Sequence, residues 1–163
     1  MDKSIKIQKD GNREYQKSQP FPQFKATRLA KSQSKPKIKI LIVEDNMIVR
    51  FSLSEILKNL GYAADFVADG KAALSQYCSD YHLILMDLDI PFLSGIEVTQ
   101  IIREFEKNHH FNHVPIVAMT SHANEPECEE KCLSAGMNGL SGKPNAEQLK
   151  ALIIKYSKNY ITH

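Results

Sequence analysis

The sequence predicts a doubly wound α/β fold, in which parallel strands form a central sheet and helices cover both of its faces. From residue 36 onward, short apolar runs alternate with amphipathic stretches, which is typical of repeated strand–helix units. Several of these runs end in an acidic, hydroxyl or basic residue. The first 35 residues have neither feature, so we expect a domain over residues 36–160 and a separate tail over residues 1–35.

The tail is basic, whereas the expected domain is mildly acidic. Residues 1–35 contain nine Lys or Arg and three Asp or Glu, and the chain totals of 21 and 19 leave residues 36–163 with a net charge of −4. Because the tail has few apolar residues to bury, we expect it to be mostly disordered. A basic arm that binds nucleic acid or anionic lipid is the alternative. The charges are spread out rather than clustered, which argues against nucleic acid as a partner.

The cysteines and the hydropathy indicate the cellular compartment. Cys78, Cys128 and Cys132 are an odd number without a CxxC pair, which argues against a disulfide framework and favours a reducing environment. The first thirty residues lack the apolar centre of a signal peptide, and no apolar run approaches the ~20 residues that a transmembrane helix requires. We therefore expect a cytoplasmic protein that does not insert into a membrane.

The first strand–helix unit follows the tail. The apolar run at residues 38–43 predicts a strand, and Asn46 is a favoured residue for capping the helix that follows. Apolar residues recur along this helix at a spacing of three or four: Val49, Leu53, Ile56, Leu57 and Leu60. Gly61 can adopt the left-handed conformation that ends a helix, so we expect the helix to stop there.

The third strand carries the first candidate for chemistry. Before it, residues 62–68 predict a weaker strand, and a short helix follows Asp69. Residues 83–87 then begin with four consecutive apolar residues, which fit a strand that is buried on both faces. Such a run gives no reason to end in a carboxylate, so Asp87 is a candidate functional residue.

The third helix and the fourth strand also have recognisable boundaries. Ser94 and Glu97 match a capping box, in which each residue accepts a hydrogen bond from the backbone of the other. Residues 114–119 predict a strand, and Thr120 follows it directly.

Two further elements complete the pattern. Asn124 is expected to cap a fourth helix that ends at Gly136, and residues 137–141 predict a short fifth strand. Lys143 comes two residues after this strand, and Asn145 is expected to cap the last helix. Five such units with short connections predict right-handed crossovers and the flavodoxin-like (βα)5 strand order 2-1-3-4-5.

The carboxyl ends of parallel strands meet at one edge of the sheet, where open α/β folds bind ligands. Glu44 and Asp45 come from the first strand, Asp87 from the third, Thr120 from the fourth and Lys143 from the fifth. Clustered carboxylates repel, and a hard divalent cation neutralises them. Three acids are too few for a calcium cage but suit Mg²⁺ (or Mn²⁺), which completes its octahedron with water, backbone and phosphate oxygens. A lysine and a hydroxyl nearby can then bind phosphoryl oxygens, and an Asp carboxylate can accept the phosphoryl group.

Four segments resemble the receiver domain of two-component response regulators and hybrid sensor kinases. They are IVEDN at residues 42–46, LILMDLDIP at 83–91 with SG at 94–95, PIVAMT at 115–120 and AGMNGLSGKP at 135–144. The resemblance implies that Asp87 accepts a phosphoryl group from a phosphohistidine. It also implies that Asp45, Asp87 and the backbone carbonyl of Asp89 bind Mg²⁺ directly, and that Glu44 binds it through water.

The resemblance also assigns a switch. Thr120 matches the hydroxyl that moves toward the phosphoryl group, Lys143 matches its ion-pair partner, and the Lys143–Pro144 peptide bond matches one that is cis in the family. Many members carry an aromatic residue where this chain has Leu140, so an aromatic switch is in doubt here.

Other residues near the expected site have open roles. Asp89 and His122 each lie two residues beyond a site residue, and we expect them to modulate the lifetime of the phosphorylated state. Met47 and Ile48 begin the first helix, close to Glu44 and Asp45 in the sequence. They are either core residues or part of the surface that docks the phosphohistidine donor.

The implied partners are a sensor histidine kinase or a histidine phosphotransfer protein, together with an unknown downstream protein. The sequence leaves open whether phosphorylation dimerises the protein. Such a domain is expected not to be a multiple-turnover enzyme, although it would catalyse its own phosphorylation and dephosphorylation.

An alternative is a metal-dependent phosphohydrolase of the haloacid dehalogenase type, in which Asp87 would be the nucleophile. The motif of that class also begins with Asp-x-Asp after an apolar strand, which Asp87 and Asp89 match. However, Pro91 stands where those enzymes usually have Thr or Val, and their paired acids follow the nucleophile rather than precede it.

Overall fold

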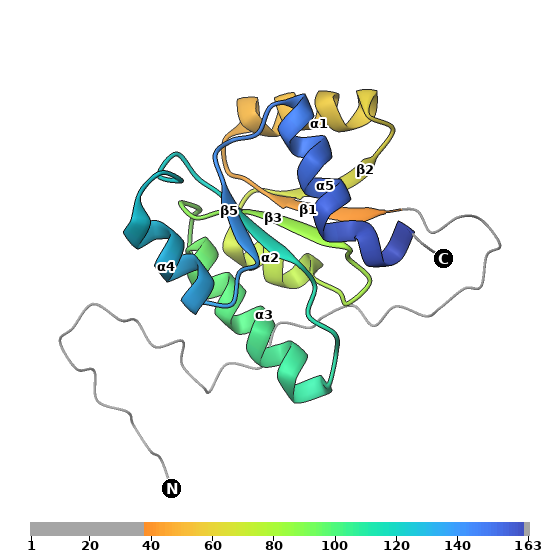
Figure 1. Cartoon of the computed structure of the whole chain (residues 1–163). Helices are drawn as coiled ribbons and strands as arrows, with labels where there is room; N and C mark the ends of the chain where they lie inside the picture. The colour runs from red at the N-terminus through yellow and green to blue at the C-terminus, as the bar shows by residue number, and fades with distance from the viewer. Residues whose placement is uncertain (1–37, 162–163) are drawn as a thin grey trace, which may run out of the picture.

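The computed structural model describes residues 38–161, and it has the doubly wound architecture that the sequence predicts (Figure 1). All the strand pairs are parallel, and the strand order is β2-β1-β3-β4-β5. The strands are β1 (Lys39–Val43), β2 (Ala63–Val67), β3 (Leu83–Asp87), β4 (Ile116–Met119) and β5 (Gly139–Ser141). The predicted fold class and strand order are confirmed. The predicted tail lies outside the described residues.

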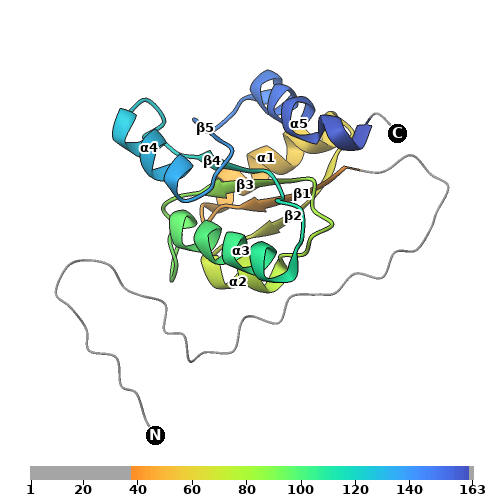
Figure 2. The same cartoon turned by 60° about the horizontal axis from the view of Figure 1, so that its bottom comes forward.

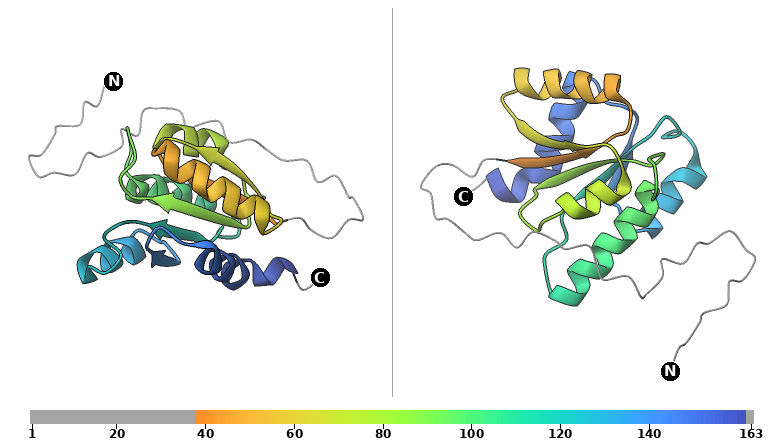
Figure 3. Two further views of the ribbon diagram at one scale, coloured as in Figure 1. Left: turned by 90° about the horizontal axis from the view of Figure 1, so that it is seen from above. Right: turned by 180° about the vertical axis from the view of Figure 1, so that it is seen from behind.

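The helices form a layer on each face of the sheet. They are α1 (Met47–Asn59), α2 (Gly70–Gln76), α3 (Gly95–His109), α4 (Pro126–Ser134) and α5 (Ala146–Ile161). Helices α1 and α5 cover one face, and α2 and α3 cover the other (Figure 2). Seen from above, α4 and α5 lie on the β5 side of the sheet, away from α1 and α2 (Figure 3). Within the described residues, no helix is long and apolar enough to cross a membrane.

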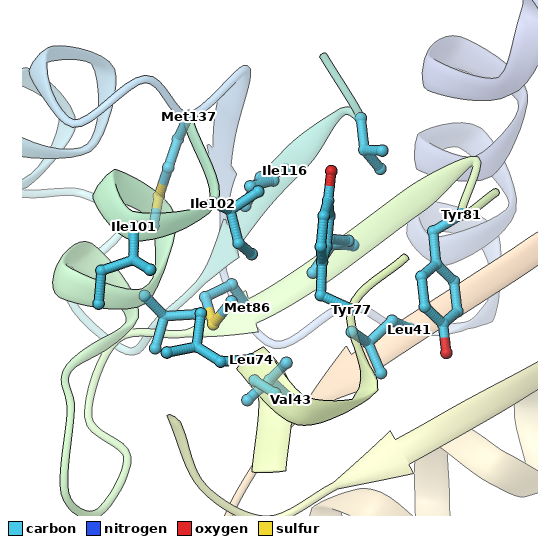
Figure 4. Packing of buried hydrophobic residues seen from close by; sticks show 14 of the residues in the cluster. Leu41, Val43, Leu74, Tyr77, Tyr81, Met86, Ile101, Ile102, Ile116 and Met137 are labelled. Atoms are coloured by element: carbon cyan, nitrogen blue, oxygen red, sulfur yellow. The ribbon is translucent and has the colours of Figure 1, made fainter. Parts of the chain in front are cut away.

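Alternating strand residues supply two hydrophobic cores. Leu41 and Met86 point toward α2 and α3, whereas Ile42 and Leu85 belong to the core beneath α1 and α5. Figure 4 shows the first core, in which side chains from α2 and α3 pack against the strands. All five residues of β3 are buried. The central strand is therefore held from both faces, which fixes the position of the residue at its end.

Local capping explains most of the helix boundaries. The Asn46 side chain accepts hydrogen bonds from the N–H groups of Ile48 and Val49, and Gly61 has a φ of +80° just beyond α1. The capping box between Ser94 and Glu97 is complete at the start of α3. These three predictions are confirmed, and each rests on hydrogen bonds or backbone geometry within a few residues.

The predicted cap of α4 is wrong. The N-cap is Glu125 rather than Asn124, and its side chain makes no capping hydrogen bond. The reason is that Pro126 occupies the first turn, where its fixed φ favours helix initiation and its missing N–H costs nothing. The side chain of Glu125 instead pairs with His122. Helix α4 therefore begins without the side-chain cap that α1 and α3 have.

Candidate functional site

The carboxyl edge of the sheet brings the predicted acids together. Carboxylate oxygens of Glu44, Asp45 and Asp87 all lie within 4.8 Å of one another. Glu44 is fully buried and Asp87 is 6% exposed, whereas Asp45 faces the solvent. Oxygen donors from carboxylates, with one open side, are the donor set that Mg²⁺ accepts, because this ion keeps several waters or phosphate oxygens in its coordination shell. The residues present thus fit the predicted metal.

Lys143 connects two of these carboxylates. Its Nζ donates a hydrogen bond to Oδ2 of Asp87 at 2.6 Å and another to Oε2 of Glu44. Burial alone would lower the pKa of Lys143, but its hydrogen bonds to Asp87 and Glu44 outweigh burial and raise the pKa. Lys143 is therefore a fixed positive charge beside Asp87 at neutral pH.

Glu44 is held on both of its carboxylate oxygens. Oε1 accepts a hydrogen bond from the backbone N–H of Asn46 at 3.1 Å, and Oε2 accepts from Lys143. The backbone N–H of Glu44 donates to the carbonyl of Val67 at 3.0 Å, which ties it to β2. A buried carboxylate is tolerated only when it is paired and hydrogen-bonded in this way. Glu44 therefore acts as the anchor of Lys143 in this structure.

Thr120 lies buried at the end of β4, and both its backbone N–H and its hydroxyl are hydrogen-bonded. Its backbone N–H donates to the carbonyl of Ser141 at 3.0 Å, and its Oγ1 accepts from the N–H of His122 at 3.1 Å. No hydrogen bond joins Thr120 to Asp87 in the part of the chain that the structure describes. Thr120 is thus on the correct edge, with its hydroxyl turned toward the loop that leads to α4.

A pocket of about 260 Å³ opens beside this hydroxyl. Asp89, Thr120 and His122 line it together with α4 residues such as Cys128. His122 is exposed, and its ring pairs with Glu125 at 2.8 Å, which raises the pKa of His122. The backbone N–H of Asp89 donates to Oδ1 of Asp87 at 3.3 Å. Asp89 and His122 therefore line the same pocket, and Asp89 also contacts Asp87 through its backbone N–H.

Gly95 is a residue of the site to which sequence reasoning gave no role. A Cβ at this position would lie 2.3 Å from the backbone oxygen of Asp87 and 2.8 Å from the Met86 side chain. The absence of a side chain lets the start of α3 pack directly against the end of β3. A glycine at the first position of an otherwise well-formed helix is the signal that could have indicated this contact.

The Lys143–Pro144 peptide bond corrects a prediction. None of the described peptide bonds is cis, so this bond is trans rather than cis. Trans is the more stable isomer by about 0.5–1 kcal/mol even before proline. With the trans bond, Lys143 already reaches Asp87 and Glu44, so contact with the acids does not require the cis isomer.

Two further residues are placed by the structure. Leu140 is half-buried on β5 and packs against the core beneath α2 and α3. Met47 and Ile48 are 73% and 76% exposed on α1, and Phe51 beside them is 68% exposed. Of the two roles left open for Met47 and Ile48, burial in the core is therefore excluded. They form an exposed apolar patch beside the acid pair.

The fold and the site together define a class: flavodoxin-like α/β domains with an acidic, magnesium-compatible cluster and a lysine at the carboxyl edge of the sheet. A family model described as the response regulator receiver domain matches residues 40–154. The chain belongs to this family, and it is a receiver domain of two-component phosphorelay signalling.

Relatives with curated descriptions are of two kinds. The chain is 38% identical over 112 residues to hybrid signal transduction histidine kinase I of Dictyostelium discoideum, covering 65% of this chain and 6% of that protein. It is 36% identical over 110 residues to two-component response regulator 24 of Arabidopsis thaliana, covering 66% of this chain and 75% of that protein. The chain thus spans most of a short response regulator but only a small part of the hybrid kinases.

Solved structures show the same relationship. The receiver domain of Ssk1 from Saccharomyces cerevisiae, crystallised with the histidine phosphotransfer protein Ypd1, is 33% identical with a TM-score of 0.68, covering 79% of this chain and 94% of that one. The receiver domain of a Pseudomonas aeruginosa sensor histidine kinase is 35% identical with a TM-score of 0.62, covering 75% and 98%. That structure holds a magnesium ion in its active-site cleft. These relatives favour a receiver over a dehalogenase-type phosphohydrolase.

Proposed function

We propose that this chain accepts a phosphoryl group on Asp87 from a phosphohistidine, with Mg²⁺ (or Mn²⁺) as the cofactor. The observation that carries the proposal is the contact of Asp87 with Lys143 inside a cluster of three carboxylates. A structural ion pair would not need two further acids within 4.8 Å of it. A site that handles phosphate and metal needs both signs of charge at this spacing.

The metal would be held by the carboxylates of Asp45 and Asp87 and the backbone carbonyl of Asp89, with Glu44 contacting it through water. When bound, Mg²⁺ neutralises the negative charge on the phosphoryl oxygens and on the accepting carboxylate. The chain's own residues supply the remaining positive charge, because Lys143 lies against Asp87.

In the transfer, a carboxylate oxygen of Asp87 forms the new bond to phosphorus as the bond from phosphorus to the histidine nitrogen breaks. The imidazole leaves with the electron pair of that bond and takes up a proton. Lys143 shifts from Oδ2 of Asp87 to a phosphoryl oxygen, while its hydrogen bond to Glu44 keeps it in place. Positioning and charge account for most of the catalysis, since phosphoryl transfer needs little acid–base chemistry.

The phosphoryl group would then recruit Thr120. Its hydroxyl accepts from the N–H of His122 in this structure, and rotation about χ1 would turn it toward the phosphoryl oxygens. This movement would shift a pre-existing equilibrium in the surface of α4 and β5, which would bind a downstream protein differently in the two states. Leu140 has no aromatic ring, so the switch would act through Thr120 and the backbone.

The exposed apolar patch of Met47, Ile48 and Phe51 supports a docking site for the phosphohistidine donor. Large exposed apolar side chains in one cluster are typical of protein interfaces. The patch lies on the first turns of α1, directly after the acid pair. The receiver domain of Ssk1 was crystallised with a histidine phosphotransfer protein. We propose a partner of that kind, or a sensor histidine kinase, for this chain.

Asp89 and His122 would set the lifetime of the phosphorylated state, because Asp89 contacts Asp87 through its backbone N–H and both residues line the pocket beside Thr120. The substitutions Asp89→Asn and His122→Ala test this role. We expect the rate of dephosphorylation to change in each variant, and unchanged rates in both would reject the role.

The experiment that tests the proposed function is intact mass after incubation with acetyl phosphate. The wild-type chain should gain one phosphoryl group in the presence of Mg²⁺ and none after chelation of the metal. Asp87→Asn should gain none, whereas the matched control Asp80→Asn, outside the acid cluster, should behave as the wild type. Steady release of product from a generic phosphomonoester by the wild type would instead support the phosphohydrolase.

A further inference from the structure

Arg50, on α1, contacts the loop that carries Glu44 and Asp45. Its side chain is half-buried, and its Nη1 donates hydrogen bonds to the backbone carbonyls of Glu44 at 2.8 Å and Asp45 at 2.7 Å. One guanidinium nitrogen thus ties two consecutive peptide groups, both belonging to acids of the site. Sequence reasoning assigned Arg50 no role, because no pattern along the chain reveals a bond to a backbone carbonyl five or six residues earlier.

These bonds matter because Asp45 has little else to orient it. Its carboxylate faces the solvent and accepts no hydrogen bond from any other described residue. The backbone of Asp45 therefore determines where its Cβ lies and how far the carboxylate is from the other two acids. The backbone N–H of Arg50 also donates to the carbonyl of Asn46, so α1 holds three consecutive residues of the loop.

We infer that Arg50 is a positioning residue for the metal: it fixes the backbone of Glu44 and Asp45 so that the carboxylates are pre-arranged for Mg²⁺. This inference rests on the proposed function, since it assumes that the cluster binds Mg²⁺. Removing a group that hydrogen-bonds to a metal ligand and orients it typically lowers the metal affinity by about tenfold or more.

The charge of Arg50 has the opposite effect on the metal. A guanidinium beside the carboxylates repels a cation, so an Arg50 that acted only through its charge would weaken Mg²⁺ binding. Removing that charge would then strengthen binding, whereas removing a positioning group would weaken it. The direction of the change in affinity therefore separates the two roles.

The test is a Mg²⁺ titration of the unphosphorylated full chain, followed by backbone amide NMR. Arg50→Met keeps the approximate length of the side chain but removes both the charge and the donors. We expect its Mg²⁺ affinity to fall about tenfold or more. The matched control is Lys58→Met, which removes the same charge from the last turn of α1, where Lys58 makes only an exposed pair with Glu55. Its affinity should match that of the wild type.

Arg50→Lys provides a second variant, which keeps the charge but loses the planar donor group. Positioning predicts weaker Mg²⁺ binding in Arg50→Lys, whereas a pure charge effect predicts no change. Hydrogen exchange at the amides of Asp45 and Asn46 in the metal-free protein should be faster in both Arg50 variants. Unchanged or tighter Mg²⁺ binding in Arg50→Met and Arg50→Lys would overturn the inference. A wild-type chain that binds no Mg²⁺ would overturn the proposed function itself.

Discussion

The two sides of the carboxyl edge are built differently. On one side, β3 is buried along its whole length, α1 has a side-chain cap, and Lys143, Glu44 and Asp87 are joined by hydrogen bonds. On the other side, none of the three residues of β5 is fully buried, and α4 lacks a side-chain cap and buries only Cys132. Local stability follows buried apolar contacts and satisfied ends. The carboxylates proposed for chemistry thus lie on the firmly packed side, and Lys143 reaches them from the loop after β5. The surface proposed to change lies on the weakly packed side.

The largest expected effect is on the free energy of unfolding, and it is measured by replacing one leucine on each side. Leu85→Ala, in the centre of β3, should lower the free energy of unfolding by about 2–5 kcal/mol, because a fully buried side chain leaves a cavity. Leu140→Ala, on β5, should cost only about 1 kcal/mol, because Leu140 is half-buried. Urea unfolding of both variants measures the difference. Equal losses would remove the contrast between the two sides.

A smaller loss of stability is expected when the ion pairs of Lys143 with Glu44 and Asp87 are removed. Lys143→Met should abolish phosphorylation by acetyl phosphate and lower the free energy of unfolding by about 1–2 kcal/mol. Glu44 would remain buried without its partner, although solvent at the partly exposed Lys143 reduces the cost. Intact mass and urea unfolding provide the measurements. Lys131→Met, which removes the same charge from α4, is the control and should keep both properties.

The N-cap side chains of α1 and α4 should differ in their contribution to the free energy of unfolding by about 1 kcal/mol. Asn46→Ala should lower the free energy of unfolding by about that amount, because the N–H groups of Ile48 and Val49 lose their acceptor. Asn124→Ala should have almost no effect, since Asn124 does not cap α4. If both substitutions cost the same in thermal unfolding, the assignment of the α4 cap to Glu125 would be contradicted.

The smallest effect concerns the exposed pair of His122 and Glu125. The hydrogen bond and charge of Glu125 raise the pKa of His122 above its ordinary value of 6.5. A raised pKa in the folded state means that the pair contributes fully below pH 6.5 and that its contribution is lost as the pH rises through the folded pKa. An NMR titration of the His122 ring should give a midpoint above 6.5, and Glu125→Gln should lower that midpoint. A midpoint that Glu127→Gln lowers equally would show that the pairing with Glu125 is not specific.

The same contrast explains what could be predicted from the sequence. The firm side is encoded locally: an apolar run defines β3, and Asn46, Ser94 and Gly61 mark helix ends by bonds or backbone geometry within a few residues. The predicted strand order also places Asp87 at the same edge of the sheet as the other acids. Local patterns therefore carried most of the fold and the positions of the candidate site residues.

The remaining features depend on competition or on distant contacts. At α4, Pro126 prevailed over Asn124 in setting the helix start, and both residues are common near helix starts. The cis and trans isomers of the Lys143–Pro144 bond differ in free energy by only about 0.5–1 kcal/mol. Contacts elsewhere in the fold can therefore decide which isomer forms. The roles of Arg50 and Gly95 depend on backbone atoms elsewhere in the chain, which periodicity and composition do not reveal.

The most direct test of the central claim is the position of the phosphoryl group. The chain would be treated with acetyl phosphate and Mg²⁺ and then reduced with borohydride, which converts an aspartyl phosphate to homoserine. Mass spectrometry of the peptides that contain residues 42–46 and 83–95 would locate the converted residue. The account predicts homoserine at position 87 alone, and only in the treated sample. Homoserine at position 45 or 89, or no conversion anywhere, would contradict it.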